Sequence, residues 1–161
     1  MKIVSRSAAV RLDGVTKAFG KTIAVDAVTL DIEAGTLVTL LGPSGCGKTT
    51  TLRMIAGLET QTSGHVLIGG KDVTLLPPNE RDVSMVFQSY ALFPHMSVIE
   101  NVSYGLRQSQ LSRASQRDKA REGLKLVGLE RYDDRLPSEL SGGQQQRVAI
   151  ARALVNQPSL I

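Results

Sequence analysis

The sequence has few cysteines, histidines and aromatic residues. Cys46 is the only cysteine among 161 residues, so no disulfide can form within the chain, which fits a reducing compartment. His65 and His95 are the only histidines, and they stand in no metal-ligand or catalytic-triad spacing. Aromatic residues make up 4%, and the lysines and arginines are scattered despite a net charge of +4. Both features argue against nucleic-acid binding and favour a solvated surface.

Long hydrophobic runs are also absent. No stretch approaches the roughly 20 apolar residues that a helix needs to cross a bilayer. The N-terminal segment Met1–Ser7 carries charge but no apolar core, so we expect no secretory signal. Hydrophobic residues make up 42% and charged residues 21%, the composition of a soluble globular protein. The length predicts one domain with a core of its own.

The most informative segment is Gly42–Thr49, which has the G-x-x-x-x-G-K-T spacing of a phosphate-binding P-loop. The apolar run Thr36–Leu41 predicts a buried parallel strand before it. Lys48–Ala56 predicts a helix after it, with an apolar face of Leu52, Ile55 and Ala56 and a stop at Gly57. Strand, glycine loop and helix in this order aim backbone N–H groups and a positive helix end at one anion. Lys48 would reach the β- and γ-phosphates of a nucleoside triphosphate, and the Thr49 hydroxyl would ligate Mg²⁺. The predicted nucleotide site comprises Gly42, Pro43, Ser44, Gly45, Cys46, Gly47, Lys48, Thr49 and Thr50.

A second glycine cluster, Leu140–Gln144, precedes another predicted helix. Ser141 can cap this helix, whose apolar stripe consists of Val148, Ala151, Leu154 and Val155. The chain thus has two helix starts suited to anions. One triphosphate does not need two complete binding loops from one small domain, so the second helix start would serve a nucleotide bound by a partner. The alternative is an ordinary cap before a core helix. Because Gln144–Arg147 follows it and a P-loop precedes it, the cluster resembles the signature motif of ABC-transporter ATPase subunits, and the resemblance covers nearly the whole chain.

The resemblance implies an α/β fold. It would be a P-loop NTPase with a RecA-like core sheet, an antiparallel β subdomain and an inserted α-helical subdomain. Residues 1–161 would form a single partial ABC ATPase domain. Residues 1–95 would form the nucleotide-binding core with its β subdomain, 96–138 the helical subdomain, and 139–161 the signature motif and the helix that returns to the core.

The family also implies roles for further residues. Its subunits pack head to tail, so Ser141, with Gly142, Gly143 and Gln144, would clamp the γ-phosphate held by a partner's P-loop. Gln88, expected at the end of a core strand, would orient the attacking water and ligate Mg²⁺. Phe19 would stack on adenine, although an isolated phenylalanine near a turn is more often part of a core. The implied cofactors are ATP and Mg²⁺.

Tyr90–His95 and the helix after it resemble the surface that couples to membrane subunits. The string from Val86 to Leu106 resembles importers of sugars, polyamines, sulfate, iron or phosphonates, and it does not identify the solute. The implied partners are a second ATPase subunit, transmembrane permease subunits and, indirectly, a solute-binding protein. The implied location is the cytoplasmic face of the cell membrane.

The sequence departs from the family at its C-terminal end. No Asp or Glu follows Glu139, so the Walker B aspartate and the catalytic glutamate are absent, as is the switch histidine. Ser159–Ile161 resembles the start of the missing strand, and we expect an N-terminal fragment that binds Mg-ATP without hydrolysing it. The alternatives are a non-hydrolysing nucleotide-binding module and a soluble ABC protein without a transport role. A GTPase is disfavoured because no Asn-Lys-x-Asp motif is present.

Local patterns predict several further elements. Val10–Val15 and Ala27–Ile32 alternate like half-exposed antiparallel strands, and Val66–Val73 contains a Gly-Gly hairpin turn. Ser97–Glu100 is a capping box before a helix with Ile99, Val102 and Leu106 buried. Ser115–Val127 predicts a charged amphipathic helix that ends at Gly128.

Overall fold

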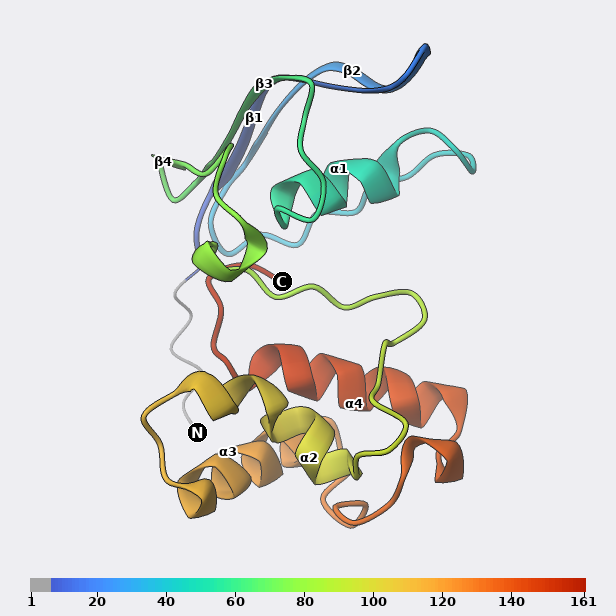
Figure 1. Cartoon of the computed structure of the whole chain (residues 1–161), viewed down its shortest axis with the longest axis vertical. Helices are drawn as coiled ribbons and strands as arrows, with labels where there is room; N and C mark the ends of the chain where they lie inside the picture. The colour runs from blue at the N-terminus through green and yellow to red at the C-terminus, as the bar shows by residue number, and fades with distance from the viewer. Residues whose placement is uncertain (1–6) are drawn as a thin grey trace. The chain divides into compact units, whose positions relative to one another are not determined.

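The computed structural model describes residues 7–161 (Figure 1). The segment in which we expect no secretory signal therefore lies, apart from Ser7, outside the described residues. The chain divides into two compact units. The sheet unit comprises the described residues up to Val83 together with Leu160, and the helical unit comprises Ser84–Ser159 with Ile161. In residues 7–161 no helix has the length and apolarity to span a membrane.

The sheet unit is an antiparallel sheet with one helix. Its strands are β1 (Val10–Phe19), β2 (Thr22–Ile32), β3 (Ser63–Ile68) and β4 (Lys71–Asp72), in the order β2-β1-β3-β4. Helix α1 (Lys48–Ile55) lies against this sheet, and a short 3₁₀ turn, η1 (Pro78–Glu80), follows (Figure 1). The core of the unit consists of Val10, Leu12, Val15, Val25, Met54, Ile55, Val66, Ile68 and Val73.

Three local predictions in this unit are confirmed. The two alternating segments form β1 and β2, which pair with Val10 opposite Ile32 and Leu12 opposite Leu30. The Gly-Gly turn joins β3 to β4, and both glycines adopt left-handed φ angles of 58° and 77°. Such angles favour glycine, since it has no Cβ to clash with the backbone. The helix after the P-loop also forms and stops before Gly57.

Arg81 is a buried cation that ties the end of α1 to the loop after β4. Its Nη1 donates to the carbonyl oxygens of Met54 (2.7 Å) and Ile55 (2.9 Å). Nε donates to Leu76 and Nη2 to Thr74. The guanidinium therefore satisfies carbonyls that the last turn of a helix leaves unpaired, and its positive charge suits the negative end of the helix dipole.

Two predicted parallel strands are absent from the structure. Thr36–Leu41 is irregular, with Leu37 97% and Leu41 95% exposed, and no strand leads into Gln88. A parallel strand is stable only when neighbouring strands pair its backbone groups. Among the described residues the only parallel pairing is an isolated bridge between Val83 and Leu160. That bridge involves the C-terminal tripeptide that resembles the start of a further strand.

One side chain of α1 is also placed differently from the prediction. Leu52, expected on the buried face, is 47% exposed. The buried face consists of Thr51, Met54 and Ile55, which follow the i, i+3, i+4 spacing of a helix packed on one side.

The helical unit contains three α-helices that pack against one another. They are α2 (Val98–Ser103), α3 (Arg113–Leu126) and α4 (Gly142–Leu154), with 3₁₀ turns η2 (Tyr104–Gln108) and η3 (Pro137–Glu139) (Figure 1). The capping box at Ser97 and the buried stripe of α2 are confirmed. Helix α3 begins two residues earlier than predicted because Ser112 caps it. The core consists of Val98, Ile99, Val102, Leu106, Ala120, Leu124, Leu129, Leu140, Val148, Ala151 and Val155.

Asn101 is the fully buried polar residue of this unit. Its Nδ2 donates to the carbonyls of Phe93, Met96 and Ser97 at 3.0–3.1 Å, and its Oδ1 accepts from the Phe93 N–H at 2.8 Å. Such full use of one amide fixes the loop before α2 to the helix.

Candidate nucleotide-binding site

The P-loop leads directly into the start of α1. Gly47 is the residue before the first helical turn, with a φ of 89°, and no side chain of the described residues caps the helix there. The first turn contains no acidic residue. Because the first N–H groups of a helix have no partner within it, these donors and the positive end of the dipole are available to an anion.

Glycine is required at position 47 for two reasons. Its left-handed φ disfavours any residue with a Cβ. A Cβ there would also overlap the carbonyl oxygen of Ala24 and lie 3.0 Å from Val25 Cγ2 on β2. The loop backbone therefore packs directly on a strand of the sheet, which fixes where the helix begins.

Lys48 folds back over the loop that it would use to bind phosphate. Its Nζ donates to the carbonyl oxygens of Gly42 (2.8 Å) and Pro43 (2.7 Å) and to Cys46 Sγ (3.3 Å). Phosphate oxygens are charged and are stronger acceptors than peptide carbonyls. The ammonium group can therefore exchange these carbonyls for a phosphate without leaving the loop.

Thr49 offers a hydroxyl group suited to a magnesium ion. Its side chain is exposed, and its hydroxyl makes no hydrogen bond within the described residues. Mg²⁺ prefers oxygen ligands. It usually takes one or two of them from the protein and the others from phosphate groups and water. In residues 7–161 no cluster of three or more His, Cys, Asp or Glu side chains could hold a metal. The loop fits a magnesium ion that enters with the nucleotide.

Phe19 ends β1 with its ring 49% exposed. Lys17 Nζ lies 4.8 Å from the ring centroid, and this ammonium is held by the Glu59 carboxylate (2.7 Å) and the Thr60 carbonyl (2.7 Å). One face of the ring is thus covered by a fixed cation. The exposed part of the ring is free to stack on a nucleobase, as the resemblance predicts.

The signature segment forms a capped helix start. Ser141 Oγ accepts from the Gln144 N–H (3.3 Å), and Gln144 Oε1 accepts from the Ser141 N–H (2.8 Å). A Cβ added to Gly142 or Gly143 would meet no described atom within 4 Å, so this helix start is open to solvent. Capping and anion binding are compatible here, because the serine hydroxyl proton remains available to donate.

Gln88 lies in an exposed turn in which the Tyr90 N–H donates to the Phe87 carbonyl at 2.9 Å. The expectation that it ends a core strand is wrong for this structure, because that strand does not form. Gln88 and the signature residues belong to the helical unit, and Phe19 and the P-loop belong to the sheet unit.

Arg152 is a residue of this region that the sequence did not single out. From α4 its Nη1 donates to the carbonyl of Ala91 (2.7 Å) and its Nη2 to that of Tyr90 (2.8 Å), and its guanidinium lies 5.8 Å from the Phe93 ring centroid. Tyr90 and Ala91 have left-handed φ angles of 62° and 47°, which are unfavourable for residues other than glycine. Partial burial lowers the pKa of Arg152 from its usual value. This arginine clamps the turn directly after Gln88.

The sheet unit, its uncapped P-loop helix and the capped glycine start of α4 are the parts of a P-loop ATPase cassette. A sequence profile of the ABC transporter family matches residues 25–161, and the chain belongs to that family. The fold class and the family predicted from the sequence are thereby confirmed. The individual site residues remain predictions.

The curated relatives are ATP-binding proteins of iron import. The chain is 65% identical over 159 residues to the Fe(3+) ions import ATP-binding protein FbpC of Agrobacterium fabrum, covering 99% of this chain and 45% of the relative. It is 55% identical over 150 residues to the FbpC protein of Pasteurella multocida, covering 93% and 43%. The chain therefore spans less than half the length of these relatives.

Solved structures show the same fold. The chain is 40% identical to the ATP-binding cassette MJ0796, solved as a dimer in a post-hydrolysis state with ADP and Pi. The TM-score is 0.83, and the match covers 92% of this chain and 70% of that chain. A second dimeric structure of the same bacterial ABC transporter cassette matches with a TM-score of 0.84 at 39% identity.

Proposed function

We propose that the chain is the nucleotide-binding part of the energy-coupling ATPase of a ferric-ion importer. The observation that carries this proposal is the P-loop, in which Lys48 sits over an uncapped helix start. The iron solute is supported by the 65% identity to an Fe(3+) import protein. The ATPase subunit would lie at the cytoplasmic face of the membrane. Its partners would be the permease subunits and, indirectly, a solute-binding protein.

The residues of the sheet unit would bind ATP together. The N–H groups at the start of α1 and the Lys48 ammonium would hold the phosphates, and Phe19 would stack on adenine. The Thr49 hydroxyl would ligate Mg²⁺, which supplies charge neutralisation of the phosphates. Gln88 would complete the metal shell and orient water in the complete protein.

The open start of α4 supports a role across a dimer interface. Ser141 is exposed, and a Cβ at Gly142 or Gly143 would meet no described atom within 4 Å, so a second subunit could bring its γ-phosphate to them. Gln144 would act there through its side-chain Nε2, because its Oε1 accepts from the Ser141 N–H and its own N–H donates to Ser141 Oγ. Two such subunits would form two composite nucleotide sites.

Nucleotide binding is tested by titrating the chain with a fluorescent ATP analogue. Lys48→Ala should weaken binding roughly 10- to 150-fold, because a charged hydrogen bond to phosphate contributes about 1.5–3 kcal/mol. Lys21→Ala is the matched control, since Lys21 is an exposed lysine of the same unit in the turn between β1 and β2. Equal affinities for the wild type and Lys48→Ala would show that the P-loop does not hold the phosphates.

Hydrolysis is tested in two proteins. The 161 residues alone should bind ATP without turnover, because they lack the carboxylates that activate water. In the full-length protein, turnover per subunit should rise with concentration, and Ser141→Arg should abolish it while monomer binding persists. A mixture of Ser141→Arg and Lys48→Ala subunits should regain activity from one intact composite site. Turnover by the 161-residue chain, or a normal rate in Ser141→Arg, contradicts the mechanism.

The solute is tested with vesicles that contain the full-length protein and its permease subunits. ATP should drive accumulation of radioactive ferric iron, and Lys48→Ala in the full-length protein should stop it. Uptake of a sugar or a polyamine in place of iron would refute the iron assignment while leaving the ATPase assignment intact.

A further inference from the structure

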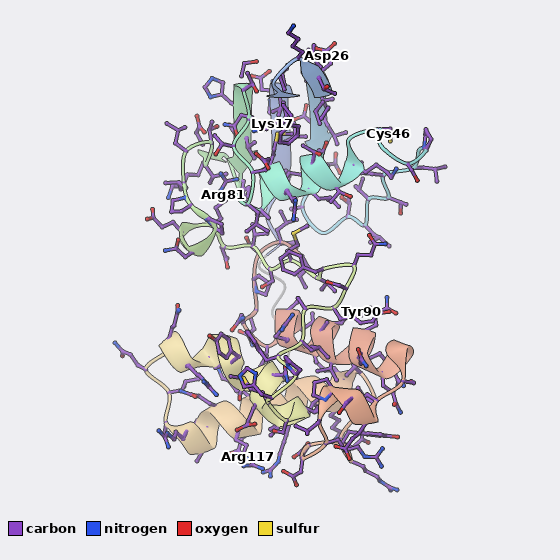
Figure 2. All side chains as sticks on the ribbon, turned by 45° about the vertical axis from the view of Figure 1, so that its right-hand side comes forward. Lys17, Asp26, Cys46, Arg81, Tyr90 and Arg117 are labelled. Carbon is purple, nitrogen blue, oxygen red and sulfur yellow. The ribbon has the colours of Figure 1, made fainter. Side chains whose placement is uncertain are left out.

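Three arginines surround one cavity in the helical unit. The cavity has a volume of about 630 Å³ and is lined by Arg107 of η2, Arg113 and Arg117 of α3, and the polar side chains of Ser103, Glu100 and Gln116. Ile99 is its only apolar lining residue. Arg117 is labelled in Figure 2, among the helices of this unit. We propose that this cavity binds a small polyanion that carries two or more phosphate or carboxylate groups.

The lining carries an excess of positive charge. Three guanidinium groups face one carboxylate, which leaves a formal charge of +2 (3 − 1). The Glu100 carboxylate already accepts a hydrogen bond from the Ser97 N–H at 2.8 Å. This bond, followed by the charges of Arg107 and Arg117, lowers the pKa of Glu100 from its usual value. The carboxylate thus caps α2 and offsets only part of the positive charge of the three arginines.

The arginines have little compensation elsewhere. Arg117 forms an ion pair of 3.2 Å with Asp134, but both side chains are exposed, and such pairs contribute little. Arg107 stacks on the Tyr104 ring at 5.0 Å, which orients its guanidinium without satisfying its donors. Arg113 has no hydrogen bond or ion pair within residues 7–161. The planar fork of a guanidinium is well suited to bidentate contacts with phosphate or carboxylate oxygens, and the cavity lining offers three of them.

The size and polarity of the cavity indicate a small molecule. Its volume falls within the range of 300–1,000 Å³ that small-molecule sites occupy. A lining with one apolar residue disfavours a hydrophobic ligand, and three arginines disfavour a cation. The cavity shares no residue with the P-loop, the signature segment or Gln88, so its ligand would be an effector separate from the nucleotide of this chain.

The test measures anion binding by calorimetry in a Lys48→Ala chain, which removes the main phosphate contact of the P-loop. Pyrophosphate and tricarballylate are the probes, one for each type of anionic group. Each should bind one equivalent, and the Nε resonances of arginine side chains should shift in NMR spectra. Arg113→Gln with Arg117→Gln should weaken binding at least roughly tenfold.

Control variants separate this site from general charge effects. Arg131→Gln removes one charge from an exposed arginine of the same unit outside the cavity, and it should leave the affinity unchanged. Arg113→Lys keeps the charge but loses the guanidinium fork, so we expect an affinity between those of the wild type and the double variant. This milder change keeps the test decisive if the double variant misfolds. The proposal would be overturned if neither probe binds, or if Arg131→Gln loses as much affinity as the double variant. It would also be overturned if a poly-glutamate peptide binds and the two small probes do not.

Discussion

Removing Arg152 should release the turn that follows Gln88. The two hydrogen bonds to Tyr90 and Ala91, at 2.8 and 2.7 Å, are charge-assisted and contribute about 1.5–3 kcal/mol each, or about 3–6 kcal/mol together. Two left-handed residues other than glycine cost about 1–2 kcal/mol each, or about 2–4 kcal/mol together. With the middle of each range, the clamped turn is favoured by only about 1.5 kcal/mol, which corresponds to a roughly tenfold population ratio.

Hydrogen exchange at the Tyr90 amide measures this balance, because that N–H donates to the Phe87 carbonyl only while the turn is closed. In Arg152→Met its protection should disappear, whereas the Phe93 amide, held by the Asn101 side chain, should keep much of its own. Changing both Tyr90 and Ala91 to glycine in Arg152→Met removes the strain and should restore part of the protection.

The matched control is Arg147→Met, on the same helix. Arg147 donates one exposed hydrogen bond, to the Val127 carbonyl, and does not contact the turn. Its loss should leave the Tyr90 amide unchanged. Wild-type protection in Arg152→Met, or equal loss in both variants, would refute the view that this arginine holds the strained turn.

Three further predictions concern stability and pH. Arg81→Met should lower the free energy of unfolding by about 3–5 kcal/mol in urea titrations, because it removes four charge-assisted hydrogen bonds and leaves the Ile55 carbonyl at the end of α1 without its donor. Arg53→Met, an exposed change on that helix, should have little effect. Asn101→Leu should cost about 3 kcal/mol or more, because the Phe93 N–H and the Met96 carbonyl lose their hydrogen-bond partner, and a cost below about 1 kcal/mol would contradict the hydrogen-bond assignment. The pKa of Glu100 is lowered in the folded chain by the hydrogen bond from Ser97, so its stabilising effect is complete above the unfolded pKa and is lost as pH falls through the lowered folded value. Glu100→Gln should therefore flatten the acid limb of the stability–pH curve, and an unchanged limb would contradict the assignment.

Elements that depend on neighbouring residues could be predicted from the sequence. The capping box at Ser97, the helix cap at Ser141 and the Gly69–Gly70 turn involve contacts within three residues. Their side-chain chemistry is specific enough to be recognised without knowledge of the fold. The P-loop belongs to the same group, because its glycines and Lys48 act on the adjoining backbone.

Features that depend on distant partners could not be predicted. The strand expected at Thr36–Leu41 is apolar and β-prone, but its formation requires neighbouring strands that residues 7–161 do not supply. Arg152 and Arg81 donate to backbone carbonyls, which every residue carries. The types of the accepting residues therefore do not indicate these contacts in the sequence. The arginine cavity likewise arises from η2 and α3 coming together, although Arg113 and Arg117 are spaced four apart on one helix face.

The close approach of Gly57 and Arg81 has a consequence for the divergence of related sequences. Gly57 has a φ of 73°, and a Cβ there would lie 2.6 Å from Arg81 Nε. A larger residue at position 57 therefore requires the Arg81 guanidinium to move away. Conversely, loss of the guanidinium removes one of the two constraints that favour glycine, the close contact, and leaves only the left-handed φ. These two positions, 24 residues apart, should covary through evolution, with small residues at 57 accompanying arginine at 81.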